Sequence, residues 1–188
     1  MDQRSPPVLP LPWGGAARFD GEGAGVRPRI TLVVVGKLRE TWWEDACAEY
    51  LKRLGGLASS VVVHEVADEP TPQSASDADE ARTRMREGER ILARVPERDV
   101  VVALDVRGSR MDSVAFSRWM ERRCAEGSGT GFTFVIGGSL GLSDAVLARA
   151  DQRISYGPMT FPHALARVML LEQLYRAFRI QRGEPYHK

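Results

Sequence analysis

Short runs of apolar, β-branched residues alternate along this chain with longer segments whose apolar residues repeat at helical spacing. The run at 30–35 is continuous and ends at a glycine, a pattern typical of a strand buried on both faces of a parallel sheet. Similar runs, partly aromatic, predict further strands at 61–66, 99–105 and 131–134, and a brief strand is predicted at 153–155.

The segments between these runs predict helices. Apolar residues recur at three- and four-residue spacing in segments 41–54, 79–95, 112–126, 144–150 and 164–181. In the second of these, Met85, Gly88, Leu92 and Val95 form the stripe that we expect to face the core. Strands that alternate with helices predict an α/β fold, with a mostly parallel sheet covered by helices on both faces.

The first 29 residues differ from the rest. They are rich in proline and glycine and show no periodic pattern, so we expect residues 1–29 to be a disordered N-terminal extension. The remaining residues, 30–188, are expected to form a single domain, since 188 residues with 43% hydrophobic content suit one core. No apolar run approaches the ~20 residues of a membrane span.

Composition narrows the possible function classes. A net charge of +1 gives no global electrostatic argument for nucleic-acid binding, although segment 161–188 carries five Lys or Arg against two Glu. This basic end could contact phosphate or could be a solvated helix face. Cys47 and Cys124 lie far apart without metal-ligand spacing, so we expect no metal site and a reducing, cytoplasmic location.

A glycine-rich turn, 137–142, follows the strand predicted at 131–134. Three glycines fall within five residues, and Ser143 then suits a helix N-cap. Such a turn lets the backbone approach a ligand, and ligands of parallel sheets bind at this edge. The spacing matches neither a dinucleotide fingerprint nor a P-loop, and Ser139 has no evident base. A tight turn without a ligand is the alternative.

Three strand ends are expected to converge: Leu104-Asp105, the glycine turn and the loop 156–161. A cofactor with an adenosine could lie there on backbone groups. His163, at a helix start, could act as a base or donor, or could simply pack. Tyr186, His187 and Lys188 combine aromatic and cationic groups that suit a nucleobase and its phosphate, unless the end is an exposed tail.

Taken together and in order, several stretches resemble the large-subunit ribosomal RNA methyltransferase H family, a branch of the SPOUT, or trefoil-knot, methyltransferases. The resemblance covers 30–188, and residues 1–29 have no counterpart in it. The stretches that carry it are Leu32–Lys37, Leu104-Asp105 with Gly108, Ile136-Gly137-Gly138 with Gly141-Leu142, Met159-Thr160-Phe161-Pro162-His163, Glu172–Ala177 and Pro185-Tyr186-His187-Lys188.

The resemblance implies a homodimer with a C-terminal trefoil knot that binds S-adenosylmethionine. It implies methylation of N3 of a pseudouridine in 23S rRNA of the large subunit, on the assembled ribosome. By motif, the cofactor would contact Leu104, Gly137 and the loop residues Tyr156, Gly157, Pro158, Met159, Thr160 and Phe161.

The resemblance also implies that the tail of one subunit lies near the cofactor of the other, where Tyr186 and His187 would help to form the substrate site. The acceptor nitrogen must lose a proton, and either His163 or His187 could assist. Two alternatives remain: a ribose 2′-O-methyltransferase of the same superfamily, and a ribosome-binding factor that uses the fold without catalysis.

Overall fold

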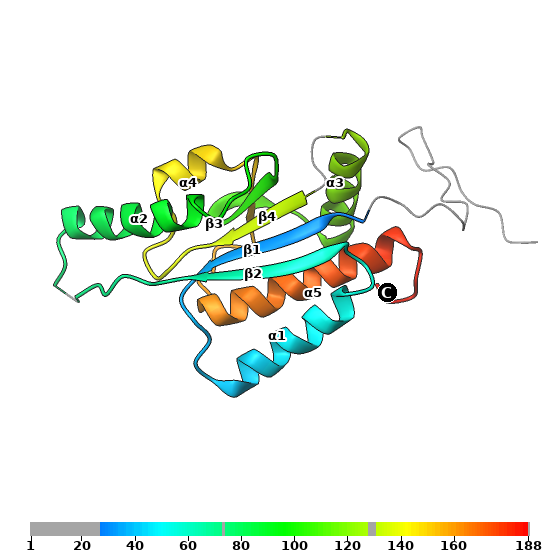
Figure 1. Ribbon diagram of the computed structural model, residues 1–188, viewed down its shortest axis with the longest axis horizontal. Coiled ribbons are helices and arrows are strands. Elements are labelled where there is room, and N and C mark those ends of the chain that lie inside the picture. Colours follow the sequence, from blue (N-terminus) through cyan, green and yellow to red (C-terminus); the bar gives the residue numbers. More distant parts are fainter. Residues whose placement is uncertain (1–26, 73, 128–130, 188) are drawn as a thin grey trace, which may run out of the picture.

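One parallel sheet forms the centre of the molecule. The computed structural model describes residues 27–72, 74–127 and 131–187, and in this part five strands lie in the order β2-β1-β4-β3-β5 (Figure 1). Every neighbouring pair is parallel, which confirms the predicted fold class. The strands are β1 (Arg29–Val35), β2 (Ser60–Val66), β3 (Val100–Arg110), β4 (Gly131–Ile136) and β5 (Gln152–Ser155).

The helices cover both faces of the sheet, as predicted. In Figure 1, α2 and α4 lie on one side of the sheet, and α1 and α5 lie on the opposite side. Core contacts place α3 on the same face as α1 and α5. The bounds are α1 (Thr41–Leu54), α2 (Asp77–Leu92), α3 (Ser113–Ala125), α4 (Asp144–Arg149) and α5 (His163–Gln181).

Strand β1 shows why both faces need cover. Its alternate side chains point to opposite sides: Ile30 and Leu32 join the core under α1, α3 and α5, and Val33 joins the core under α2 and α4. All three are fully buried. Each such side chain stabilises the fold by roughly 1.5–3 kcal/mol when it leaves water, so an uncovered face would be costly.

Strand β1 begins one position before its predicted start. Residues 1–26 of the predicted disordered extension lie outside the described residues. Arg29 is already the first residue of β1 and pairs with the buried Asp99, one position before the predicted start of the strand.

Strand β3 is longer than the sequence predicted. We expected it to end at Asp105, but it runs to Arg110. After Leu104 the chain bulges for four residues and then returns, so that Leu104 and Ser109 both face Ile154 of β5. Gly108 allows this return, because a Cβ there would lie 2.7 Å from the backbone of Ile154.

The predicted buried stripe of α2 was wrong at Met85, which is 55% exposed. Gly88 is buried as predicted, and Glu87 and Ile91 complete the buried face. The reason is a close approach to α4: a Cβ on Gly88 would lie 2.1 Å from Oγ of Ser143. That contact fixes the rotation of α2, and it turns Met85 towards solvent.

Candidate active site

The carboxyl ends of three strands lie side by side, as the sequence predicted. Leu104 of β3 faces Ile136 of β4 on one side and Ile154 of β5 on the other. The glycine turn and the loop after β5 therefore leave the same edge of the sheet, where parallel α/β proteins bind their ligands.

The glycine turn is closed by its own backbone. Gly137 packs so closely that a Cβ would lie 2.9 Å from the carbonyl carbon and oxygen of Gly141. The N–H of Gly141 donates to the carbonyl oxygen of Gly138 at 3.1 Å, and Gly141 has a φ of +82°. Ser143 caps α4 as predicted, accepting the N–H of Val146. Any side chain at Gly137 would collide with the opposite half of the turn.

Two acidic side chains at this edge each keep one oxygen without a hydrogen-bond partner among the described residues. Glu87 is 4% exposed, and its Oε1 accepts the N–H of Glu69 at 3.0 Å. Its Oε2 has no partner and lies 2.9 Å from where a Cβ on Gly138 would be. Burial is the main cause that raises the pKa of Glu87. Asp105 likewise holds the N–H of Arg107 with Oδ1 at 3.1 Å and leaves Oδ2 buried without a partner.

The loop after β5 is fixed at its start and exposed further on. Oγ of Ser155 accepts the N–H of Gly157 at 3.0 Å, and Gly157 has a φ of +120°. The same Oγ lies 3.1 Å from the carbonyl oxygen of Val106, which joins this loop to the bulge of β3. Beyond it, Pro158, Met159 and Thr160 are exposed, with Met159 at 69%.

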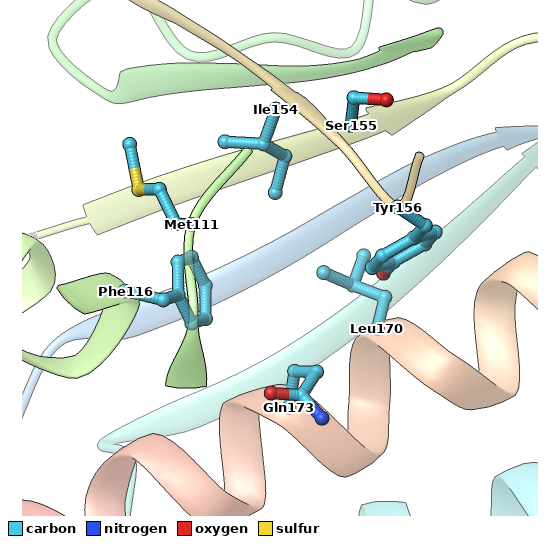
Figure 2. A pocket seen from close by; sticks show the side chains of 7 residues that line it. All are labelled: Met111, Phe116, Ile154, Ser155, Tyr156, Leu170 and Gln173. Carbon is cyan, nitrogen blue, oxygen red and sulfur yellow. The ribbon is translucent and has the colours of Figure 1, made fainter. Parts of the chain in front are cut away.

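A cavity of about 490 Å³ opens between the end of β3, the end of β5 and helix α5. Its polar lining residues include Arg110, Asp112, Tyr156, Glu172, Gln173 and His187. A smaller hollow of about 70 Å³ adjoins it. Figure 2 shows this hollow, with Ile154 and Phe116 on one side, and Leu170 and Gln173 of α5 below Tyr156.

Tyr156 contributes its side chain to both hollows. Its hydroxyl oxygen is buried and has no hydrogen-bond partner among the described residues. Burial, and then the charge of Glu172, raise the pKa of Tyr156 far above its usual range. At neutral pH this hydroxyl is therefore a neutral, buried donor for which no described residue supplies an acceptor.

The C-terminal tail folds back on α5. The ring of Tyr186 meets that of Tyr175 edge to face at 4.9 Å, and its hydroxyl donates to Oε1 of Glu172 at 3.3 Å. The guanidinium of Arg176 lies 4.7 Å from the centre of the Tyr186 ring and 3.4 Å from Nδ1 of His187. These contacts hold His187 at the wall of the larger cavity.

The predicted site residues are only partly brought together. Tyr156 and His187 share one cavity, and Tyr186 anchors the tail beside it. Leu104 and Gly137 lie at the sheet edge and are not among the residues that line the cavity.

His163 lies apart from this cavity. It is the first residue of α5, and its Nε2 lies 3.3 Å from where a Cβ on Gly36 would be. The buried Arg167 fills the same corner, donating to the carbonyl oxygen of Gly36 at 3.0 Å and to Glu65 at 2.7 Å. Packing was one of the two roles predicted for His163, and a role as a base or donor stays a prediction.

Sequence reasoning missed the roles of Glu172 and Arg176. Arg176 donates to Oε1 of Glu172 through Nη2 at 2.6 Å and Nε at 3.0 Å. Their four-residue spacing puts both on one face of α5, which could have pointed to an ion pair. The spacing of Glu172 and Arg176 could not have shown that the C-terminal tail packs on this pair.

The described residues contain no group of three or more His, Cys, Asp or Glu that could hold a metal ion. Among the helices in the described ranges, none is long and apolar enough to cross a membrane.

Comparisons with known proteins agree over nearly the whole fold. A family model described as "Predicted SPOUT methyltransferase" matches residues 29–187. A protein of Clostridium acetobutylicum named "Ribosomal RNA large subunit methyltransferase H" is 50% identical over 159 residues, which are 85% of this chain and 99% of that protein. Proteins of the same name from Carboxydothermus hydrogenoformans and Listeria monocytogenes are 48% and 50% identical, with the same coverage.

Proposed function

This chain belongs to the SPOUT methyltransferase family, and from that premise we propose that it methylates N3 of a pseudouridine in 23S rRNA. The methyl donor is S-adenosylmethionine, and the substrate is the assembled ribosome. The observation that carries the proposal is the shared name of relatives that are about half identical over nearly their full length.

The sheet edge suits S-adenosylmethionine, which when bound supplies a methyl group on a positively charged sulfonium. We propose that it contacts Leu104, Gly137 and the loop 156–161. The glycine turn offers backbone groups without side chains, and the unpaired Oδ2 of Asp105 suits a hydroxyl such as those of a ribose. The C-terminal trefoil knot is part of the proposal.

The described residues act mainly by positioning. Methyl transfer to a nitrogen depends on holding donor and acceptor in line, and the cavity beside Tyr156 has room for a base. His187, Arg110 and Gln173 are among the groups lining that cavity that can donate to a carbonyl oxygen of a pyrimidine. His163, packed on Gly36, is less suited to contact the substrate.

We also propose that two copies of this chain form a dimer in which the tail of one subunit borders the cofactor site of the other. Tyr186 and His187 are then shared between sites. Sedimentation as a monomer at the working concentration would contradict this part of the proposal.

The small net charge of +1 supports a folded particle as the substrate. Proteins that bind free RNA through phosphates usually carry a marked basic surface. A ribosomal substrate places the reaction in the cytoplasm.

The test is transfer of labelled methyl from S-adenosylmethionine to ribosomes that lack the modification, with free rRNA assayed alongside. We expect label on intact ribosomes, recovered as N3-methylpseudouridine after digestion and mass spectrometry. Label on ribose would indicate a 2′-O-methyltransferase instead. Ribosome binding without any cofactor binding would indicate a non-catalytic factor.

A further inference from the structure

The tail histidine is held by a cation on one of its two ring nitrogens. Nη1 of Arg176 lies 3.4 Å from Nδ1 of His187. Arginine is always protonated and can only donate, so Nδ1 must accept in this contact. A neutral imidazole with an accepting Nδ1 carries its proton on Nε2. Protonating Nδ1 as well would set one N–H against another.

From this contact we infer that Arg176 is a positioning residue that keeps His187 as the Nε2–H tautomer. His187 then serves the cavity as a hydrogen-bond donor and not as the proton acceptor. The inference rests on the proposed function, and it decides a question that the sequence left open between His163 and His187.

The position of Arg176 is itself well determined. Two of its nitrogens donate to Glu172, one turn earlier on α5, and its guanidinium plane lies over the ring of Tyr186. The hydroxyl of Tyr186 donates to the same Glu172 oxygen. Glu172 therefore holds both the arginine and the tail, which fixes where Nδ1 of His187 can lie.

The other charged groups around the cavity are compatible with this assignment. Besides Glu172 on α5, they are Arg110 at the end of β3 and Asp112 at the start of α3. Among the described residues, no carboxylate pairs with either ring nitrogen of His187, and the contact to its Nδ1 comes from Arg176. A histidine that served as a base would need a free lone pair, and here Nδ1 is engaged while Nε2 carries the proton.

A donor has a clear use in the proposed reaction. N3 of a pyrimidine is flanked by two carbonyl groups, so the charge left by loss of its proton spreads onto their oxygens. The N3 proton leaves to water, and the N3 lone pair then forms the bond to the methyl carbon. The carbon–sulfur bond breaks, and its electron pair returns to sulfur as a neutral thioether. The Nε2–H of His187 stabilises the charged oxygen throughout.

Substitutions of His187 separate a donor from a base. In His187→Gln the amide N–H₂ can replace Nε2–H, but the side chain cannot accept a proton; His187→Ala has neither ability. We expect kcat of His187→Gln to stay within about tenfold of wild type and that of His187→Ala to fall roughly 100-fold or more, as on loss of one oxyanion donor. Equal loss in both variants would overturn the inference.

A double-mutant cycle tests whether Arg176 acts through His187. We expect Arg176→Gln to lower kcat roughly tenfold with little change in KM for S-adenosylmethionine, since an orienting residue acts on the tautomer. In the His187→Gln background, which has no tautomer to fix, the same change is expected to have a much smaller effect. If the two substitutions lowered kcat additively, Arg176 would not act through His187. Arg84→Gln removes an arginine from another helical Glu–Arg pair, Glu80–Arg84, and serves as the matched control.

A readout independent of activity is available. The chain has three histidines, so long-range ¹H–¹⁵N NMR can assign the ring of His187 by its absence in His187→Gln. We expect the spectrum of the His187 ring to show the Nε2–H tautomer in wild type and a mixture of both tautomers in Arg176→Gln. A wild-type Nδ1–H pattern would overturn the inference. If the Nε2–H tautomer were observed but no ribosome were methylated, the proposed function would be refuted and the inference about the tautomer would stand.

Discussion

Two regions of this molecule hold candidate site residues by different means. The glycine turn after β4 is held by its own backbone, with Gly137 packed on Gly141 four residues away. The tail cluster (Glu172, Arg176, Tyr186 and His187) is held by side chains that carry charges and rings across 15 residues of sequence. The glycine turn has its shape because glycine has no side chain. The tail cluster has its shape because of contacts between its side chains.

Because of this difference, substitutions in the glycine turn should affect the stability of the fold, and substitutions in the tail cluster should affect the placement of site residues. An added atom in the glycine turn has no space, so it must disturb the fold itself. A lost atom in the tail cluster leaves the sheet and both cores intact, because Glu172 and Arg176 are partly exposed and lie outside them. The turn should therefore be sensitive in unfolding experiments, and the tail cluster in activity experiments.

The largest effect is expected from Gly137→Ala. The new methyl would lie 2.9 Å from two backbone atoms of Gly141, so we expect the free energy of unfolding to fall by roughly 3 kcal/mol. Urea unfolding followed by circular dichroism measures this. Gly56→Ala is the control, since nothing lies within 4 Å of that position. Equal stability of the two variants would show that the turn is not tightly held.

Tyr186→Ala should lower activity strongly and stability little, the opposite of what is expected for Gly137→Ala. It removes the contact with Tyr175 and the bond to Glu172, so His187 loses its anchor. We expect kcat to fall about 100-fold, equivalent to ~2.7 kcal/mol in the activation barrier, because small displacements of reacting groups are costly. Unfolding in urea should change by less than ~1 kcal/mol, as for most surface positions. A stability loss as large as the loss in activity would remove the distinction between the two regions.

A smaller effect is expected from Glu172→Gln, which replaces the ion pair by a hydrogen bond from the charged Arg176 to a neutral amide oxygen. Such partly exposed pairs contribute about 1 kcal/mol or less. We expect faster hydrogen exchange of the tail amides in the variant at low salt. The difference should shrink towards 1 M NaCl, where the Debye length is only ~3 Å. If the difference in exchange rate between variant and wild type did not change with salt concentration, the charge of Glu172 would not be what holds the tail.

The smallest effect concerns the carboxyl that supports the glycine turn. Burial raises the pKa of Glu87 above its ordinary value of 4.5, so the folded protein keeps this proton to a higher pH than the unfolded chain does. The unfolding free energy contributed by Glu87 is then fully present below pH 4.5 and decreases as pH rises through the folded pKa. Because Gln cannot titrate, Glu87→Gln should gain stability relative to wild type over that range. A pH-independent difference in urea unfolding would contradict the assignment.

The sequence predicted the parts of the fold that depend on neighbours in the chain. Apolar, β-branched and aromatic runs located four of the five described strands, and β5 was predicted as a brief strand. The N-cap at Ser143 was identified from residue type alone. The convergence of three strand ends followed from parallel order, and the row of Leu104, Ile136 and Ile154 confirms it.

The remaining features depend on contacts between distant residues. The extension of β3 to Arg110 exists because Ser109 finds Ile154, a partner 45 positions later. The rotation of α2 that exposes Met85 is set by Gly88 against Ser143. The burial of Tyr156 and the contact of Arg176 with His187 arise in the same way, so no local pattern could have indicated them.

The order of strands in the sheet has a consequence for the nascent chain. Strand β4 lies between β1 and β3, although both are synthesised before it. Until residue 136 has been made, β3 lacks its central neighbour, and the apolar edges of β1 and β3 have nothing to pair with. At ~5–20 residues per second this state lasts on the order of seconds, in which the exposed edges invite aggregation or a chaperone. The insertion of β4 is therefore the step that joins β1 and β3 into one sheet.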